Sequence, residues 1–370
     1  MINKTSFYMR LLKKTTVVIL VCLLLFTSGC ANQVLETKPV STTPQKVTID
    51  PVNLVEANIE DLYEVAFSYD GKLIAIIKYH ESISFLSRDG TNGWELVHSI
   101  DKPGVTHMSW SPTDLRICLS YPGKLEILDL STRESVIVRE IDTPYSPHVV
   151  WSKNGELIAS SMPARSLVEG DELLAQVYDT GSLNVLRKYQ TATNNSSGSD
   201  FIDWNPENND ADIMMLRQGA GFTFINKGSS YRIEGINVIA GLGYNGIHWI
   251  DDDRFILIAN ELNLPDDREK IRMILTSSAK ISTEYIVVAE GKGAEPAQII
   301  SSVYLPGQKF LATISKTQLF NLYQIEDNSI ILCLSQKLNE INVTSHLTFD
   351  PSNGKLYLYD GDELFSISIL

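Results

Sequence analysis

Short apolar stretches that alternate with turn residues recur along most of this chain of 370 residues. VAFSYDGKLIAI (65–76) places an aromatic residue before a turn that contains Asp and Gly, and an apolar run after it. Looser copies are HMSWSPTDLRICLS (107–120), HVVWSKNGELIAS (148–160) and HLTFDPSNGKLYL (346–358). Hydrophobic and polar positions alternate with period two, and helical periodicity is almost absent, which is typical of antiparallel strands. The pattern therefore predicts an all-β protein.

The copies align on the aromatic residue that precedes each turn. At intervals of 41 to 55 residues, the aligned residues are Phe67, Trp110, Trp151, Trp204, Trp249, Tyr304 and Phe349. An interval of this length holds about four short strands, and such a repeat is the signature of a β-propeller. The sequence thus predicts a seven-bladed β-propeller of four-stranded antiparallel blades. The alternative is a β-sandwich or an open array of repeats.

The two ends of the repeat region complement each other. The last copy has room for only three strands before Leu370, whereas KVTIDPVNLVEAN (46–58) contains a spare strand. We expect this N-terminal strand to pair into the last blade as its outer strand, which closes the ring and leaves no edge bare. The aligned aromatic residues are expected to pack between blades rather than to form a platform for sugars.

Two of the copies carry a recognisable repeat motif. WSKNGELIA (151–159) and FSYDGKLIA (67–75) resemble the W/F-S-P-D-G-K-x-I/L-A repeat of the TolB-like and WD40-like propeller families. The resemblance covers nearly all of residues 46–370; it is strong in repeats 1, 2, 3 and 7 and eroded in repeats 4, 5 and 6. These families include periplasmic scaffolds, lactonases, lyases and the propeller domains of peptidases, so the fold alone implies no particular activity.

The first 29 residues have the features of a bacterial lipoprotein signal peptide. Basic residues precede the apolar run TTVVILVCLLLF (15–26), which is short for a transmembrane span. TSGC, which ends at Cys30, resembles the lipobox in which a cysteine is lipidated, although Thr27 stands where leucine is usual. A diacylated Cys30 provides two acyl chains, enough for stable anchoring. The alternative is an ordinary cleaved signal peptide in which Cys30 has no role.

This interpretation divides the chain into three segments: a signal peptide (1–29), a lipidated cysteine with a flexible tether (30–45), and the propeller (46–370). The tether is polar and contains Pro and Thr, as flexible linkers do. We expect the protein to be anchored in the bacterial cell envelope by its lipid, with the propeller facing outside the cytoplasm.

The charge of the chain excludes one class of partner. The net charge is −14, and loss of the first 29 residues leaves 27 basic against 45 acidic side chains. A chain this acidic repels phosphate backbones and anionic lipid headgroups, so nucleic acid is not an expected partner.

Cys118 and Cys333 lie in apolar runs on separate repeats, and we expect both to be buried thiols without a disulfide.

Familiar catalytic motifs are missing or lack their structural context. GLGYNG (Gly241, Gly243 and Gly246) matches a dinucleotide-binding pattern, but a strand follows it where that motif needs a helix. We therefore interpret these glycines as a loop between blades. The chain contains no G-x-S-x-G or H-E-x-x-H motif and no Cys/His pair at zinc spacing.

One set of residues combines repeat register with reactive chemistry. Three residues before the aligned aromatic residue, the repeats carry Glu64, His107, His148, Phe201, Gly246, Ser301 and His346. Glu64, His107, His148 and His346 come from blades that are consecutive around a closed ring, at the start of the innermost strand. Converging there, they form a candidate site for a divalent metal such as Zn²⁺, Mn²⁺ or Fe²⁺, or for an anionic or polar ligand with a histidine as general base.

The structural alternative is that each of these side chains only hydrogen-bonds the neighbouring blade.

Long insertions (162–172, 191–200, 260–270 and 290–298) fall on the face where the innermost strands begin, and elaborated loops often form a recognition surface. We therefore expect a monomeric binding or scaffold module for a protein, peptide or glycan of the cell envelope, with no cofactor. The alternative function is an enzyme of the lyase, lactonase or hydrolase type that uses the candidate site.

Overall fold

All regular elements in the described residues of the computed structural model are β-strands. The described residues are 46–52, 54, 61–78, 81–88, 93–141, 145–161, 172–191, 199–205, 213–217, 221–226, 229–232, 246–251, 254–263, 268–277, 299–327, 329–339, 341, 345–361 and 363–369. Within them, no helix is long and apolar enough to cross a membrane. The prediction of an all-β fold is confirmed.

The strands described form seven antiparallel sheets, which we number in chain order. Sheets 1 to 3 consist of β2 (Leu62–Phe67), β3 (Leu73–Lys78), β4 (Ser82–Arg88) and β5 (Trp94–Asp101); β6 (His107–Trp110), β7 (Arg116–Tyr121), β8 (Lys124–Asp129) and β9 (Glu134–Glu140); and β10 (Val149–Trp151), β11 (Leu157–Ser161), β12 (Glu172–Asp179) and β13 (Val185–Thr191).

Sheets 4 to 7 follow the same plan. They consist of β14 (Ser199–Trp204), β15 (Ile213–Arg217), β16 (Gly221–Asn226) and β17 (Ser229–Arg232); β18 (Gly246–Trp249), β19 (Arg254–Asn263) and β20 (Arg268–Ser277); β21 (Ile299–Leu305), β22 (Phe310–Ser315), β23 (Leu319–Ile325) and β24 (Ile330–Lys337); and β25 (His346–Asp350), β26 (Lys355–Asp360), β27 (Glu363–Ile369) and β1 (Val47–Pro51). Sheet 5 has three described strands and each of the others has four, so the predicted four-stranded antiparallel unit is confirmed.

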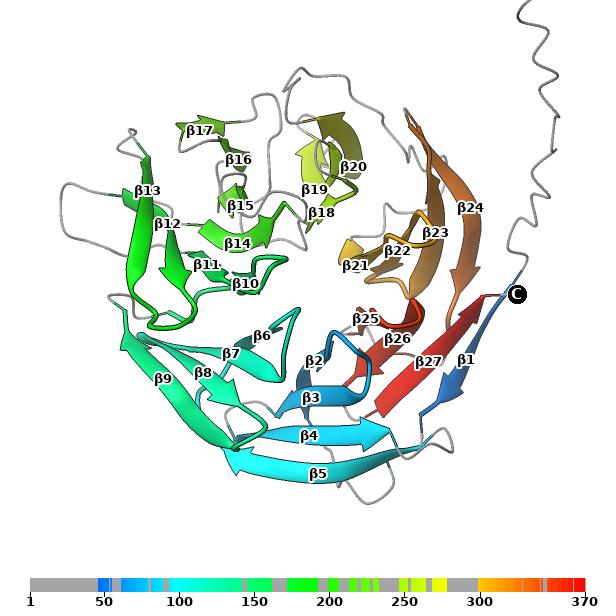
Figure 1. Ribbon diagram of the computed structural model, residues 1–370. Helices are drawn as coiled ribbons and strands as arrows, with labels where there is room; N and C mark the ends of the chain where they lie inside the picture. Colours follow the sequence, from blue (N-terminus) through cyan, green and yellow to red (C-terminus); the bar gives the residue numbers. More distant parts are fainter. Residues whose placement is uncertain are drawn as a thin grey trace, which may run out of the picture. The chain divides into compact units, whose positions relative to one another are not determined.

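The first strand of each sheet lies closest to the middle of the arrangement (Figure 1). We call these strands, β2, β6, β10, β14, β18, β21 and β25, the inner strands. Each contacts the inner strand of the next sheet, and β25 contacts β2. The apolar core lies mainly between neighbouring sheets, because the alternate side chains of each strand point to opposite faces.

The tight turns after the inner strands follow from their Ser, Asp, Asn and Gly residues. In sheet 1, the Ser68 hydroxyl donates to Asp70 at 2.8 Å and accepts from the amide of Leu73. Ser152, Asn154 and Leu157 repeat this arrangement in sheet 3. Gly71 has a φ of +66°, a region that residues with a Cβ rarely adopt, and a Cβ there would overlap the side chains of Ser352 and Asp350.

Sheet 7 joins the two ends of the described chain. β1 pairs antiparallel with β27, from Val47 opposite Ile369 to Pro51 opposite Phe365. Sheets 7 and 1 are tied by an ion pair between Arg88 and Asp350, whose nitrogen and oxygen lie 2.9 Å apart. The Asp350 side chain is completely buried.

Two sequence-based expectations need correction. In the insertion at residues 260–270, β19 and β20 continue as paired strands as far as Asn263 and Arg268, so much of this segment is hairpin rather than loop. Cys118 is buried as predicted, and burial raises the pKa of its thiol, but Cys333 is half-exposed. It lies on the outer strand β24, where an apolar sequence run does not face a neighbouring sheet. Both cysteines are free thiols.

Candidate functional site

The predicted site residues lie at one end of the inner strands. Counting back from the aligned aromatic residue, we call their position −3. Glu64 lies in β2, His107 and His346 begin β6 and β25, and His148 directly precedes β10. Because neighbouring strands are antiparallel, the second strand of each sheet ends and the third begins at this same end, which we call the loop end. The opposite end, where the inner strands finish in tight turns, is the turn end.

The Glu64 carboxylate connects sheet 1 to sheet 2. One of its oxygens accepts a hydrogen bond from the amide of Met108 at 3.4 Å. The other lies 3.4 Å from Nδ1 of His107, and the two side chains are 23% and 33% exposed. Glu64 and His107 therefore form a partly exposed carboxylate–imidazole pair across two sheets.

His148 adjoins this pair from sheet 3 and is partly buried. Its ring and that of His107 meet edge to face, with centroids 5.5 Å apart. Burial, together with the nearby His107, lowers the pKa of His148 to about 3, although a hydrogen bond to the backbone of Ile202 opposes the shift. His148 is therefore neutral at physiological pH.

His346 lies on the other side of Glu64, in sheet 7. It is exposed, and its ring stacks on that of Tyr359 with centroids 5.4 Å apart. The surrounding protein lowers the pKa of His346, while the neighbouring Glu64 carboxylate opposes this shift. The structure thus brings Glu64, His107 and His148 into one cluster and places His346 within the electrostatic reach of Glu64.

The −3 position also has a structural use that repeats around the molecule. Glu64 accepts from the backbone of Met108, Ser301 accepts from the amide of Leu347 at 3.0 Å, and His148 hydrogen-bonds the backbone of Ile202. In all three cases the backbone partner lies two residues before the aromatic residue of the next sheet. The sequence left open that each −3 side chain only hydrogen-bonds the neighbouring sheet. This structural alternative explains the contact of Glu64 with Met108 and the hydrogen bond of His148.

Two polar residues of the inner strands, Asp203 and His248, were not part of the candidate site predicted from the sequence. Burial raises the pKa of Asp203 to about 7, against hydrogen bonds from the backbone of Trp204 and Trp249. Nε2 of His248 lies 2.6 Å from the hydroxyl oxygen of Ser302, and burial lowers the pKa of His248 to about 4. Both residues directly precede an aligned tryptophan. Strand alternation places this position on the same face as −3, so the signal was present in the sequence.

The described residues contain no group of three or more His, Cys, Asp or Glu side chains arranged to hold a metal ion. Glu64, His107 and His346 do offer ligand types that metals use, and the metal hypothesis stays a prediction. Cys30, Gly241 and Gly243 lie outside the described residues, as do most of the long insertions that were expected to form a recognition surface.

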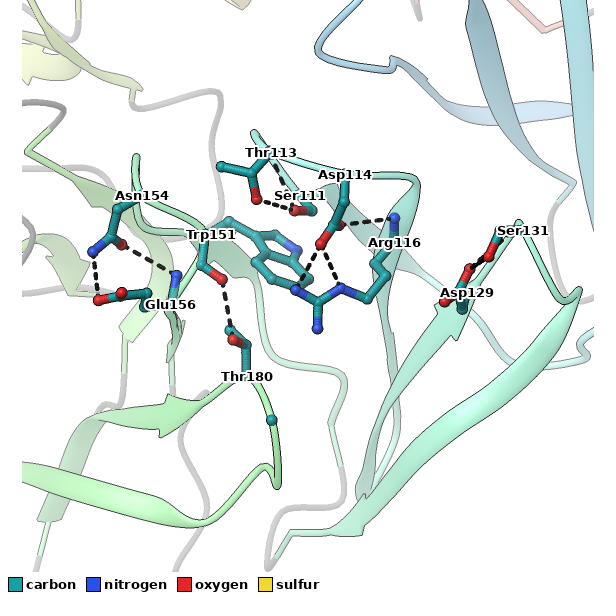
Figure 2. A network of polar contacts seen from close by, with 12 residues as sticks. Ser111, Thr113, Asp114, Arg116, Asp129, Ser131, Trp151, Asn154, Glu156 and Thr180 are labelled. Atoms are coloured by element: carbon teal, nitrogen blue, oxygen red, sulfur yellow. Dashed lines mark hydrogen bonds and ion pairs between the residues drawn. The ribbon is translucent and has the colours of Figure 1, made fainter.

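The aligned tryptophans pack between sheets. Nε1 of Trp110 donates to the carbonyl of Ala66 at 3.0 Å, and Nε1 of Trp151 donates to that of Ser109 at 2.8 Å. Figure 2 shows the turn end at sheets 2 and 3, where Asp114 holds the Arg116 guanidinium beside the Trp151 ring, 5.4 Å from its centroid. These aromatic residues are structural, as the sequence predicted.

Comparison with solved structures identifies the fold. The chain is similar to the crystal structure of the WD40 repeats of RRP9, with a TM-score of 0.62 over 87% of this chain and 100% of the other. The fold is a WD40-like β-propeller. The two sequences are only 12% identical, so the likeness concerns the fold alone. In all, 1598 solved chains are similar. A shared fold does not determine activity. No protein-family model and no curated protein matches the sequence.

Proposed function

We propose that residues 46–370 form a closed, seven-bladed propeller that acts as a binding or scaffold module in the bacterial cell envelope. Seven described sheets, the succession of inner-strand contacts and the pairing of β1 with β27 support the blade count and the closure. The motif resemblance in repeats 1, 2, 3 and 7 supports a TolB-like relationship. In this proposal each sheet is one blade, and the protein works as a monomer.

The proposed location is the outer side of the bacterial cytoplasmic membrane or of an outer membrane. Its support is the sequence of residues 1–30, in which a basic segment, a short apolar run and a TSGC lipobox follow one another. Lipidated Cys30 anchors the protein, and residues 30–45 tether the propeller to the lipid surface. Radiolabelled palmitate incorporation, lost in Cys30→Ala, tests the anchor.

The loop end is the proposed binding surface. The observation that carries this assignment is that a WD40-like fold presents partly exposed side chains of different chemistry, Glu64, His107 and His346, at one end of its inner strands. At the turn end, the tryptophans of sheets 2 and 3 make the same hydrogen bond to the preceding sheet, whereas the −3 residue at the loop end differs between sheets. Residues that vary on a rigid scaffold are typical of a recognition surface for a protein, peptide or glycan.

The test is affinity capture from envelope extracts with the full-length protein in detergent. A partner retained by the natural protein and lost in the loop-end variant Glu64→Gln/His107→Gln/His346→Gln supports the proposal. A matched turn-end variant, Lys72→Ala/Lys355→Ala, is expected to retain the partner. Loss of the partner in the turn-end variant but not in the loop-end variant contradicts the assignment.

One observation favours a second candidate, an enzyme of the lyase, lactonase or hydrolase type. The Glu64 carboxylate lies 3.4 Å from Nδ1 of His107, a placement in which a carboxylate orients an imidazole for general-base work. The candidate residues are Glu64, His107, His148 and His346. Metal analysis of the purified protein, with His107→Ala/His148→Ala as control, tests the metal-dependent version; metal bound equally by both proteins excludes this site.

A further inference from the structure

Glu64 stands between two imidazoles from different sheets. His107 contacts it from sheet 2, and His346 interacts with it electrostatically from sheet 7. In the described residues, neither imidazole hydrogen-bonds the backbone of a neighbouring sheet, unlike His148. Glu64, His107 and His346, which we call the loop-end triplet, are therefore the −3 side chains of the candidate site that remain oriented toward solvent or toward one another.

The electrostatics of the loop-end triplet favour one sign of ligand charge. Glu64 supplies the carboxylate of the triplet, and 23% of its side chain is exposed to a ligand. Among the described residues, no Lys or Arg forms an ion pair with Glu64. An anionic ligand would meet the Glu64 carboxylate with no Lys or Arg of the described residues paired to it, which favours a cationic ligand over an anionic one.

The hydrogen-bonding capacity of the triplet leads to the same class of ligand. A carboxylate only accepts hydrogen bonds, and a neutral imidazole accepts one at its unprotonated nitrogen. An ammonium or guanidinium group supplies several donors and a positive charge, and hydrogen bonds to charged partners are stronger than neutral ones. The net charge of −14 also attracts cationic partners toward the protein.

We propose that the loop-end triplet of Glu64, His107 and His346 binds a basic side chain, Lys or Arg, presented by a protein partner. The inference rests on the proposed function, because it names the chemistry that the loop end recognises. Glu64 pairs with the cation, and the two imidazoles accept its remaining hydrogen bonds.

The experiment uses the full-length protein in detergent and fluorescence anisotropy at about pH 7.5. The probes are short labelled Gly-Ser peptides that carry one Arg, one citrulline or one Glu at the same place. Citrulline keeps the shape of Arg without its charge. We expect the Arg peptide to bind about ten-fold more tightly than the citrulline peptide, and the Glu peptide more weakly than either. Equal affinity for the Arg and citrulline peptides overturns the inference.

Substitutions locate the site. Glu64→Gln, whose amide oxygen still accepts from the Met108 amide, is expected to reduce Arg-peptide affinity to the citrulline level. Glu95→Gln removes one negative charge from the exposed outer strand β5 and is expected to leave the affinity unchanged. Equal losses in both variants would mean that net charge alone attracts the peptide, and the inference fails. Circular dichroism and unfolding curves confirm that each variant is folded, and His346→Gln provides a second triplet variant.

Failure of the inference is distinguishable from failure of the proposed function. A partner captured from envelope extracts through the loop end, with the Arg peptide showing no preference over citrulline, leaves the binding module in place and removes the basic ligand. Capture of a glycan through the loop end likewise leaves the binding module in place and removes the basic ligand. Binding of the Arg peptide that is lost in Glu64→Gln supports the inference directly, whatever partner the extracts contain.

Discussion

The two ends of the inner strands differ in how strictly they repeat. At the turn end, Trp110 and Trp151 make the same hydrogen bond to the preceding sheet, at 3.0 and 2.8 Å. At the loop end, the −3 position holds a carboxylate, an imidazole, a phenyl ring, a hydroxyl or a glycine. The same strands thus form a uniform structural contact at one end and a variable surface at the other. Residues that stabilise the fold and residues proposed to recognise a partner therefore lie at opposite ends of the same short strand.

Strand geometry explains how one short element serves both purposes. Side chains at the aromatic position and at −2 share one face of the strand and pack between sheets, as Trp151 and Val149 do. Side chains at −3 and −1 share the other face and contact the next inner strand. Only the exposed part of this second face at the loop end is free to vary without a large loss of core packing.

The largest expected effect comes from breaking the turn end. Trp151→Ala removes a side chain that is buried in the core cluster between sheets 2 and 3, and we expect a loss of about 3 to 5 kcal/mol in the free energy of unfolding. Trp151→Phe keeps most of the packing and loses the bond to Ser109, at a cost of about 1 to 2 kcal/mol. Denaturant titration followed by circular dichroism measures both. A cost for Trp151→Ala no larger than that of Trp151→Phe would show that packing contributes little here.

The next largest expected loss of stability comes from breaking the ion pair that joins sheets 7 and 1. Arg88→Ala leaves the completely buried Asp350 carboxylate without its cation, although Ser352 and Asn353 still donate to it. We expect a loss of about 2 to 3 kcal/mol in unfolding free energy. The matched control is Lys72→Ala, which removes the exposed ion pair with Asp70 and is expected to cost less than about 0.5 kcal/mol. Similar costs for the two variants would contradict a special role for this seam.

Three titratable groups at the inner strands, His148, His248 and Asp203, predict opposing pH effects on stability. The folded pKa values of His148 and His248, about 3 and about 4, lie below the ordinary value of 6.5. Their stability contribution is present above pH 6.5 and falls with acid, by about 2 kcal/mol each at about pH 5. The folded pKa of Asp203, about 7, lies above its ordinary 3.8, so its contribution is present in acid and lost as pH rises through 7.

Variants separate these two contributions. The free energy of unfolding is measured between about pH 8 and pH 5 by denaturant titration. His248→Gln is expected to reduce the acid loss, whereas Asp203→Asn is expected to increase it, because the opposing carboxyl is gone. If Asp203→Asn and the natural protein lose the same unfolding free energy between about pH 8 and pH 5, the Asp203 carboxyl ionises normally in the folded protein.

The sequence predicted the fold and the −3 residues because both depend on periodic patterns. The aromatic spacing, the Asp-Gly and Asn-Gly turns and the unpaired N-terminal strand were enough to place the strands of sheets 1, 2, 3 and 7. Contacts between sheets, such as that of Glu64 with Met108, join residues 44 positions apart and leave no local signal. Asp203 and His248 were left out of the candidate site because the site was defined by the −3 register alone. The burial of Cys333 was wrongly predicted because an apolar run does not reveal which strand is outermost.

The smallest expected effect tests the −3 position itself. Ser301 and Glu64 occupy the same position and accept from equivalent backbone amides, those of Leu347 and Met108. Ser301→Ala leaves the buried Leu347 amide without this acceptor and is expected to cost about 1 kcal/mol of stability. Glu64→Gln keeps an acceptor for Met108 and is expected to cost less than about 0.5 kcal/mol, although it changes Arg-peptide binding as proposed above. A stability loss in Glu64→Gln as large as that in Ser301→Ala would mean that the charge of Glu64 holds sheets 1 and 2 together. The loop end would then be part of the structural framework rather than separate from it.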